Sequence, residues 1–285
     1  DQNKTGLKIR NSLKMLPRKL LKRKKTACQI LLVSWSGWRK CIITYNNQIK
    51  KQILFWLKED IGKGDITTQI LISPQQKTSA EIIAKEELIV CGIDIAKEIF
   101  KCLNPRINFK VIVNDGKKVR KGARLALIKG KAKDIITAER VALNILSHLS
   151  GIATTTNKFV SRIKPYKARI IDTRKTLPGL RTLEKYAVRT GGGFNHRMDL
   201  NEMILVKDNH LELIGGIKKL KSFKCGLKTE IEVKNLNEFK KALSLNPDII
   251  MLDNMPPSLI KLAAKIRNSN KPLLEASGGV NLENV

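Results

Sequence analysis

Residues 169–175 read Arg-Ile-Ile-Asp-Thr-Arg-Lys, a short apolar run that ends in polar and charged side chains. The same pattern recurs along the second half of the chain, in the runs 203–206, 230–233, 249–252 and 272–274. Helical or loop segments separate these runs. Short apolar strands that alternate with helices are typical of a parallel sheet, and in an α/β barrel the residues after each strand meet at one rim. The pattern therefore predicts an α/β barrel with a shared site at its rim.

The residues after these runs indicate the chemistry of the predicted rim. They are rich in Arg, Lys and His, and two separated carboxylates accompany them, Glu232 near the end of the run 230–233 and Asp253 directly after the run 249–252. Guanidinium groups bind carboxylates and phosphates through two parallel hydrogen bonds, and Lys acts as a mobile positive charge. Such a cluster predicts a small polyanionic substrate, and carboxylates beside it suit Mg²⁺ held together with substrate phosphates. The cations are Arg174, Lys175, Arg181, Arg189, His196, Arg197 and Lys207.

Glycine-rich segments accompany the cations. Ser277-Gly278-Gly279 follows the last apolar run and offers backbone N–H groups to a phosphate. Acyl transfer is poorly supported, because Ser277 has no nearby His in sequence and Cys225 lies among Lys residues without a partner. An alternative reading of Glu232 and Asp253 remains open, in which they are ordinary ion-pair partners of the neighbouring cations.

The preceding part of the chain predicts a small α+β domain. Its Asn114-Asp115-Gly116 segment is a hairpin turn signal. In Gly64-Asp65-Ile-Thr-Thr68 we expect the acid to cap a turn rather than to catalyse. A long amphipathic helix is predicted over 134–162, with a possible break at Gly151, an exposed Arg140 and a core His148. Helices are also predicted over 48–59 and 93–103, and strands over 79–90, 109–113 and 119–128.

The net charge is +30, from 55 Lys and Arg residues against 25 Asp and Glu residues. Residues 1–46 hold twelve of these cations and one acid, Asp1, and we expect them to form a basic extension outside the enzyme fold. A basic nucleic-acid-binding protein remains an alternative, although aromatic residues make up only 5% of the chain. No apolar stretch approaches the roughly 18 to 20 residues that cross a bilayer, so no membrane partner is expected. Five cysteines without a C-x-x-C pair favour a reducing, cytoplasmic location.

Two longer motifs carry a family resemblance. Residues 172–181 read Asp-Thr-Arg-Lys-Thr-Leu-Pro-Gly-Leu-Arg, and residues 191–197 read Gly-Gly-Gly-Phe-Asn-His-Arg. With the segments 64–68, 206–210 and 275–279, they resemble the quinolinate phosphoribosyltransferase family. The resemblance runs in order from about Gln48 to Val285 and leaves residues 1–46 unmatched. A paralogous barrel protein associated with molybdenum transport shares much of this pattern and remains an alternative.

The resemblance implies an N-terminal α/β sandwich domain, residues 47–142, joined to a C-terminally truncated α/β barrel, residues 143–285. It implies transfer of a phosphoribosyl group from phosphoribosyl pyrophosphate to quinolinate with decarboxylation, which gives nicotinate mononucleotide, CO₂ and pyrophosphate for NAD biosynthesis. It also implies a homodimer in which Arg140 reaches the partner's site, with no nucleic acid bound. Family chains continue beyond the last Gly-Gly pair, so we expect an incomplete 5-phosphate site and a poorly active or unstable chain.

The resemblance assigns roles to individual residues. Lys175, Glu232 and Asp253 are expected to be catalytic, with Mg²⁺ as the cofactor held, directly or indirectly, by the two acids. The carboxylates of quinolinate are assigned to Arg174, His196, Arg197 and Lys207. The residues assigned to phosphoribosyl pyrophosphate are Lys175, Glu232, Asp253, Ser277, Gly278 and Gly279, and Thr173 is counted among the substrate-binding residues.

Overall fold

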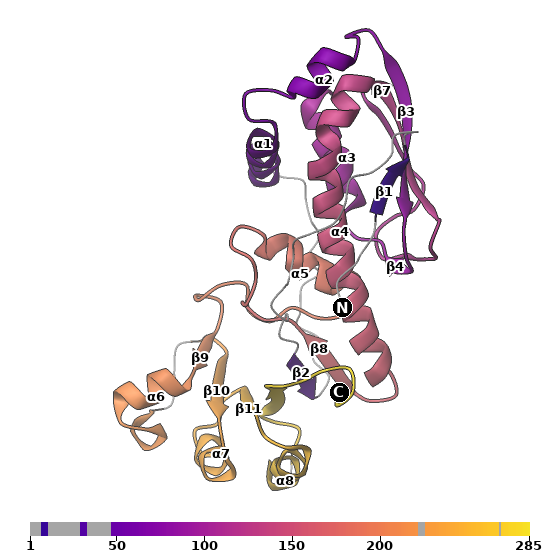
Figure 1. The fold of residues 1–285 in the computed structure, drawn as a ribbon. Coiled ribbons are helices and arrows are strands. Elements are labelled where there is room, and N and C mark those ends of the chain that lie inside the picture. Colours follow the sequence, from indigo (N-terminus) through magenta and orange to yellow (C-terminus); the bar gives the residue numbers. More distant parts are fainter. Residues whose placement is uncertain (1–6, 11–28, 33–46, 222–225, 268) are drawn as a thin grey trace. The chain divides into compact units, whose positions relative to one another are not determined.

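The computed structural model describes residues 7–10, 29–32, 47–221, 226–267 and 269–285. These residues fall into two compact units, which are described separately (Figure 1). The first contains 7–10 and 47–157, and the second contains 29–32 and 158–285. The predicted basic extension, residues 1–46, lies outside the described residues apart from two short strands, and Cys225 also lies outside them.

The first unit contains a four-stranded antiparallel sheet with the strand order β1-β3-β7-β5. Residues of alternating burial along β3, with Ala80, Ile82 and Ala84 buried, give the sheet one core face. The strand predicted over 109–113 is confirmed, but those predicted over 79–90 and 119–128 are each divided by a turn into two strands that lie in different sheets. The turn at 114–116 joins strands of different sheets, so the hairpin expected there is wrong. The strands are β1 (Leu7–Arg10), β3 (Lys77–Ala84), β5 (Asn108–Val111) and β7 (Arg124–Lys131), and β4 (Leu88–Ile89) pairs with β6 (Lys118–Val119) as a separate two-stranded sheet.

Four helices belong to this part of the chain: α1 (Asn47–Ile61), α2 (Ile66–Leu71), α3 (Ile93–Leu103) and α4 (Ala132–Ile163). The turn residue Asp115 holds the start of α3, since its two carboxylate oxygens accept the backbone N–H groups of Gly92 and Ile93 at 2.8 and 3.0 Å. The predicted break at Gly151 is wrong, because α4 continues through it. Leu149 before the glycine and Ala153 after it are both buried, so the buried stripe of the helix continues through this position.

Asp65 caps α2, as the sequence predicts. One oxygen of its carboxylate accepts the backbone N–H of Thr68 at 3.0 Å, and the other accepts the hydroxyl of Thr137 at 3.0 Å. Asp65 therefore satisfies a free donor at the helix start and also ties α2 to α4.

The second unit contains a six-stranded sheet with the order β8-β2-β12-β11-β10-β9. The four strands β9 to β12 pair in parallel, which confirms the predicted parallel sheet. Strand β2 pairs antiparallel with both β12 and β8, so β8 points the same way as the parallel strands. Closure of this sheet into a barrel stays a prediction. The strands are β8 (Ala168–Ile171), β2 (Gln29–Leu32), β12 (Leu273–Ser277), β11 (Ile249–Asp253), β10 (Thr229–Val233) and β9 (Ile204–Val206).

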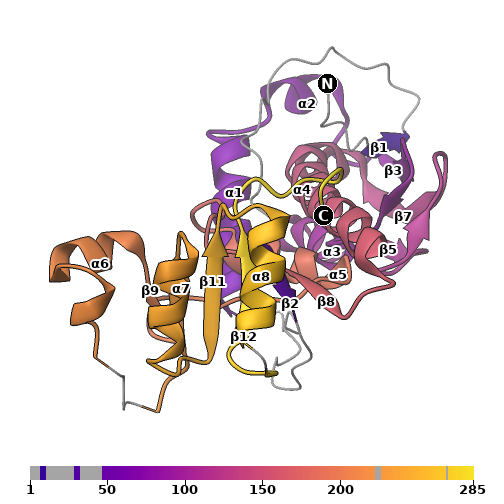
Figure 2. The same ribbon diagram turned by 90° about the horizontal axis from the view of Figure 1, so that it is seen from below.

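The helices of the second unit cover the apolar strands. Figure 2 shows α7 and α8 side by side along the parallel strands, and α7 contacts β10, β11 and α8. Phe239 of α7 is fully buried among Ile231, Val233 and Leu252 of the sheet. The helices are α5 (Arg181–Thr190), α6 (Asp208–Ile214), the 3₁₀ turn η1 (Ile217–Lys219), α7 (Leu236–Leu243) and α8 (Pro257–Arg267). Within the described ranges, every helix is too short or too polar to cross a membrane.

The cap on α2 generates a stability prediction. Replacing Asp65 with Ala removes the acceptor for the Thr68 N–H and the tie to Thr137. We expect the free energy of unfolding to fall by about 1 kcal/mol, the usual cost of losing a helix N-cap, as measured by chemical denaturation. Asp60→Ala, which removes an exposed carboxylate from the last turn of α1, is the matched control. Equal stability of the two variants would contradict the capping role.

Candidate active site

The sheet of the second unit brings the predicted strand ends to one edge. Thr173, Arg174 and Lys175 follow β8, and Lys207 follows β9. Asp253 is paired with Ser277 across β11 and β12, and Glu232 lies on the adjacent strand β10 opposite Met251. Gly278 and Gly279 follow β12. Arg140 lies in the first unit, exposed on α4 and three residues after Thr137.

Two guanidinium groups lie close together at this edge. Arg197 is 8% exposed, and burial followed by the charge of Arg174 lowers its pKa. Its Nη1 donates to the carbonyl oxygen of Met203 at 2.9 Å. The Nε atoms of Arg174 and Arg197 are both buried and have no hydrogen-bond partner among the described residues. Two adjacent cations with unused donors form a site suited to an anion.

Lys207 and two carboxylates lie on the adjoining strands. The Nζ atom of Lys207 is 3.7 Å from Oε2 of Glu232. Burial raises the pKa of Glu232, while Lys207 acts to lower it and the nearby Asp253 acts to raise it further. Two carboxylates at the ends of adjoining strands suit a hard cation such as Mg²⁺, which accepts one or two protein carboxylates and completes its coordination with water and phosphate.

The loops after β11 and β12 touch each other. The backbone N–H of Asn254 donates to the carbonyl of Ser277 at 2.8 Å, and its side-chain amide donates to Asp253 at 2.8 Å. Gly278 has a φ of 93°, and a Cβ there would lie 2.1 Å from Oδ1 of Asn254. Only glycine fits this contact, so the glycine keeps the loop close to Asp253.

A buried ion pair lies behind the end of β8. Lys185 of α5 is 1% exposed and pairs with Asp172, and its Nζ also donates to the carbonyl of His196 at 2.8 Å. Asp172 accepts the backbone N–H of His196 at 2.8 Å and the side-chain amide of Asn195. Burial raises the pKa of Asp172 and lowers that of Lys185, and each charge acts to reverse the shift of the other. This pair fixes residues 194–197 against β8.

The ring of His196 lies between carboxylates of two strands. Its Nε2 is 2.8 Å from Oε2 of Glu230 on β10 and 3.7 Å from Oε2 of Glu275 on β12. Its Nδ1 accepts the backbone N–H of Arg197 at 2.8 Å. The ring proton is therefore on Nε2, which leaves no lone pair there for a metal ion, although the three side chains have ligand-like spacing.

Glu275 is completely buried, and neither of its oxygens has a hydrogen-bond partner in the part of the chain that the structure describes. Burial raises its pKa well above the usual value, and the neighbouring Glu230 adds to the effect. A carboxyl group in such surroundings favours its neutral form.

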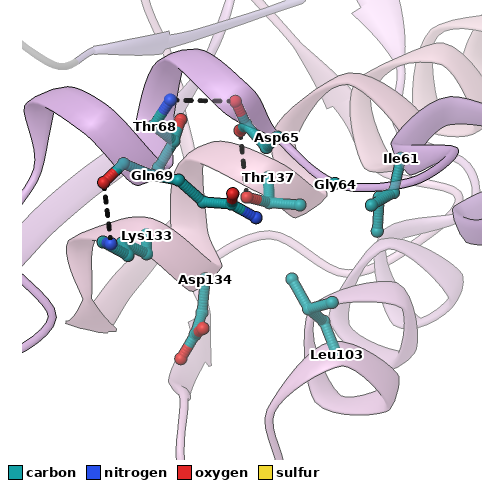
Figure 3. A pocket seen from close by; sticks show the side chains of 9 residues that line it. All are labelled: Ile61, Gly64, Asp65, Thr68, Gln69, Leu103, Lys133, Asp134 and Thr137. Carbon is teal, nitrogen blue, oxygen red and sulfur yellow. Dashed lines mark hydrogen bonds between the residues drawn. The ribbon is translucent and has the colours of Figure 1, made fainter.

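The cavity in Figure 3 belongs to the first unit and lies where α2 packs on α4. It has a volume of about 190 Å³. Its polar groups are largely used by the fold, since Asp65 binds Thr68 and Thr137, and Lys133 donates to the carbonyl of Gln69. We interpret it as a packing gap. The lining residues are Ile61, Gly64, Asp65, Thr68, Gln69, Leu103, Lys133, Asp134 and Thr137.

The strand-end pattern of the sequence does not identify the buried and half-buried residues that support the edge, which are Lys185, Asn195, Glu230 and Glu275. A signal was present for two of them. Glu230 alternates with Glu232 along β10, and Glu275 alternates with Ser277 along β12, so each pair lies on one face of its strand. Acids inside runs that should be buried on both sides indicate a polar interior.

Comparison with known proteins gives the family. The quinolinate phosphoribosyl transferase N-terminal domain matches residues 65–150, and the C-terminal domain of the same family matches residues 152–285. A probable nicotinate-nucleotide pyrophosphorylase [carboxylating] from Synechocystis is 42% identical over 237 residues, which is 81% of this chain and 80% of the relative.

A plant relative and a solved structure agree with this match. Quinolinate phosphoribosyltransferase [decarboxylating] 2, mitochondrial, from Nicotiana glauca is 38% identical over 83% of this chain and 74% of its own length. The structure of the nicotinate-nucleotide pyrophosphorylase from Francisella tularensis superimposes with a TM-score of 0.79 at 40% identity, covering 85% of this chain and 87% of that chain.

The buried Glu275 predicts a pH-dependent difference in stability between the chain and its Glu275→Gln variant. Above the ordinary pKa of 4.5, the unfolded chain loses the Glu275 proton while the folded chain retains it, so rising pH favours unfolding. Gln cannot ionise. We therefore expect the unfolding free energy of the variant, minus that of the parent chain, to increase as pH rises from 4.5 towards neutrality. Chemical denaturation at a series of pH values measures this difference. A constant difference would contradict the raised pKa.

The Asp172–Lys185 pair predicts a non-additive double mutant. Lys185→Met leaves a buried carboxylate without its cation, and we expect a loss of about 3 to 5 kcal/mol in unfolding free energy. Adding Asp172→Asn removes the unpaired charge, so the double variant should unfold at higher denaturant concentration than Lys185→Met alone. A double variant that is less stable than the single variant would exclude charge pairing as the main role.

Proposed function

This chain belongs to the quinolinate phosphoribosyltransferase family, and we infer that the edge of the sheet where β8 to β12 end carries the family's reaction. The reaction joins quinolinate to the phosphoribosyl group of phosphoribosyl pyrophosphate and releases CO₂ and pyrophosphate. Its product, nicotinate mononucleotide, feeds NAD biosynthesis.

The observation that carries this proposal is the pair formed by Arg174 and Arg197. Burial, and after it the charge of Arg174, lowers the pKa of Arg197, and each of the two residues retains a buried Nε–H without a partner among the described residues. A dicarboxylate would neutralise both charges and accept both N–H groups. Lys207 supplies a third cation on the adjacent side, beside Glu232. Quinolinate, with carboxylates on neighbouring ring carbons, matches this arrangement.

We assign phosphoribosyl pyrophosphate to the other part of the edge. Lys175 is exposed, and its backbone N–H donates to Oγ1 of Thr173 at 2.9 Å, so the turn after β8 is ordered while the ammonium group is available. Glu232 and Asp253 can bind the ribose hydroxyls, and backbone N–H groups of the segment 277–279 can bind phosphate. Mg²⁺, held at Glu232 and Asp253 through substrate oxygens, would supply positive charge to the pyrophosphate.

The chemical steps then follow from charge. The ring nitrogen of quinolinate forms a bond to C1 of the ribose while the C1–oxygen bond breaks and pyrophosphate leaves with the electron pair. Glu232 and Asp253 offset the positive charge that develops at C1, and Lys175 stabilises the departing phosphate. The quaternised ring next accepts the electron pair of the adjacent carbon–carboxylate bond as CO₂ departs, and that ring carbon takes up one proton. Arg174 and Arg197 orient the diacid throughout.

A homodimer and a cytoplasmic location are further parts of the proposal. Arg140 supports the first, because it is an exposed cation on α4 without an ion-pair partner among the contacts of the described residues, and a partner's substrate would give it one. Five cysteines without paired spacing support the second.

Release of ¹⁴CO₂ from quinolinate labelled at the carboxylate beside the ring nitrogen tests the function. We expect release that requires both phosphoribosyl pyrophosphate and Mg²⁺. The assay is run on the 285-residue chain and on the same chain followed by the C-terminal segment of the Synechocystis relative. Release from neither protein would overturn the proposed function, and a protein of the molybdenum-transport type would give that result.

An Arg197→Lys variant tests the role of the guanidinium group. Lys keeps the charge but loses the two parallel hydrogen bonds, so we expect the KM for quinolinate to rise roughly ten- to hundredfold. Arg162→Lys, an exposed replacement in the last turn of α4, is the matched control and should leave the KM unchanged. An unchanged KM in Arg197→Lys would remove Arg197 from the quinolinate site.

A further inference from the structure

The geometry points to His196 as a positioning residue that serves Arg197 rather than the substrate, with Glu230 and Glu275 as the supports of its ring. The family resemblance assigned His196 to the carboxylates of quinolinate. This inference deepens the proposed function and rests on it for the identity of the ligand.

Every polar group of His196 is already used by the protein. Its backbone N–H donates to Asp172 at 2.8 Å, and its carbonyl accepts from Nζ of Lys185 at 2.8 Å. Its Nδ1 accepts the N–H of Arg197 and its Nε2 contacts Glu230, both at 2.8 Å. The residue is only 6% exposed. No donor of His196 is left over for a ligand.

The hydrogen bonds also fix the tautomer. A backbone N–H can only donate, so Nδ1 must carry a lone pair and the ring proton must lie on Nε2. That proton points towards Glu230 in the interior of the sheet. A direct contact with quinolinate could therefore come only from Nε2, and Nε2 would first have to leave Glu230.

Leaving Glu230 would be costly. One oxygen of Glu230 already lacks a partner among the described residues, as do both oxygens of the fully buried Glu275. The imidazole N–H is the donor to the other oxygen of Glu230, at 2.8 Å, and it lies 3.7 Å from Glu275, beyond hydrogen-bond distance. Moving the ring to the substrate would take this hydrogen bond from the buried Glu230 and leave it, like Glu275, without a partner among the described residues, which is strongly unfavourable.

The imidazole instead fixes the position of the Arg197 backbone. Its Nδ1 holds the Arg197 backbone, while Met203 holds one end of the guanidinium group at 2.9 Å. With both ends fixed, the guanidinium group of Arg197 and its unpartnered Nε–H keep a defined position. Groups that orient a binding residue typically change affinity by roughly ten- to hundredfold when they are removed.

The first test is the tautomer of the ring in the intact chain, by two-bond ¹H–¹⁵N correlation NMR with ¹⁵N-labelled histidine. The chain has three histidines, and the signal missing from His196→Asn identifies the residue. We expect a protonated Nε2 and an unprotonated Nδ1, both unchanged when quinolinate is added. A protonated Nδ1, or a large shift of Nε2 with quinolinate, would overturn the inference.

The second test compares two replacements of His196 by calorimetric titration with quinolinate. Asn places an acceptor near the position of Nδ1, whereas Gln places a donor near that of Nε2. If the ring serves Arg197, His196→Asn should keep more affinity than His196→Gln, which should weaken binding roughly ten- to hundredfold. If the ring binds quinolinate, the order reverses. Affinity for phosphoribosyl pyrophosphate should match that of the parent chain and reports a folded site.

A third test compares two replacements of Glu230, one that keeps a hydrogen-bond acceptor and one that removes it. Glu230→Gln retains an acceptor for the imidazole proton and should keep quinolinate affinity, whereas Glu230→Leu should lose roughly tenfold or more. Equal affinity in these two variants would remove Glu230 from the support. A parent chain that fails to bind quinolinate defeats the proposed function instead, while the NMR measurement still decides the state and the role of the His196 ring.

Discussion

Lys185 carries a positive charge into the interior of the second unit, where only paired and hydrogen-bonded charges are tolerated. Asp172 and the carbonyl of His196 receive that charge. Because these two partners come from separate segments, the buried pair joins the end of β8 to residues 194–197. Arg174 lies two residues after Asp172, and Arg197 lies one residue after His196. The two guanidinium groups of the site therefore owe their proximity to one buried ammonium group.

The residues at the strand ends of the candidate site could be predicted from the sequence, because they lie at the ends of apolar runs and parallel strands end at one edge of a sheet. The placement of Lys175, Lys207 and Asp253 at this edge was predicted in this way. The buried residues behind this edge could not be predicted, because the pattern does not say which side of a strand faces the interior or which strands are neighbours. In the sequence, Glu230 is a single acid within an apolar strand. Its role depends on His196, which lies 34 residues away along the chain.

The first unit shows the same division between local and distant interactions. The capping role of Asp65 was predictable because it depends on residues within one helical turn. Its contact with Thr137, 72 residues away, was not. The break expected at Gly151 failed because a long buried stripe outweighs the low helix propensity of one glycine. Strand β2 carries no signal for its partners, since its pairing with β8 and β12 is entirely long-range.

The guanidinium groups of Arg174 and Arg197, whose Nε atoms have no hydrogen-bond partner in the part of the chain that the structure describes, also bear on how long the folded chain persists in a cell. Under the proposed function, an anion bound by Arg174 and Arg197 offsets the repulsion between their charges, so binding of the substrate would stabilise the second unit. A ligand that binds only the folded state raises the free energy of unfolding in proportion to the logarithm of its concentration. The amount of folded protein is thereby linked to the supply of the dicarboxylate. Scarcity of the substrate would leave the chain more open to proteolysis, and abundance would protect it.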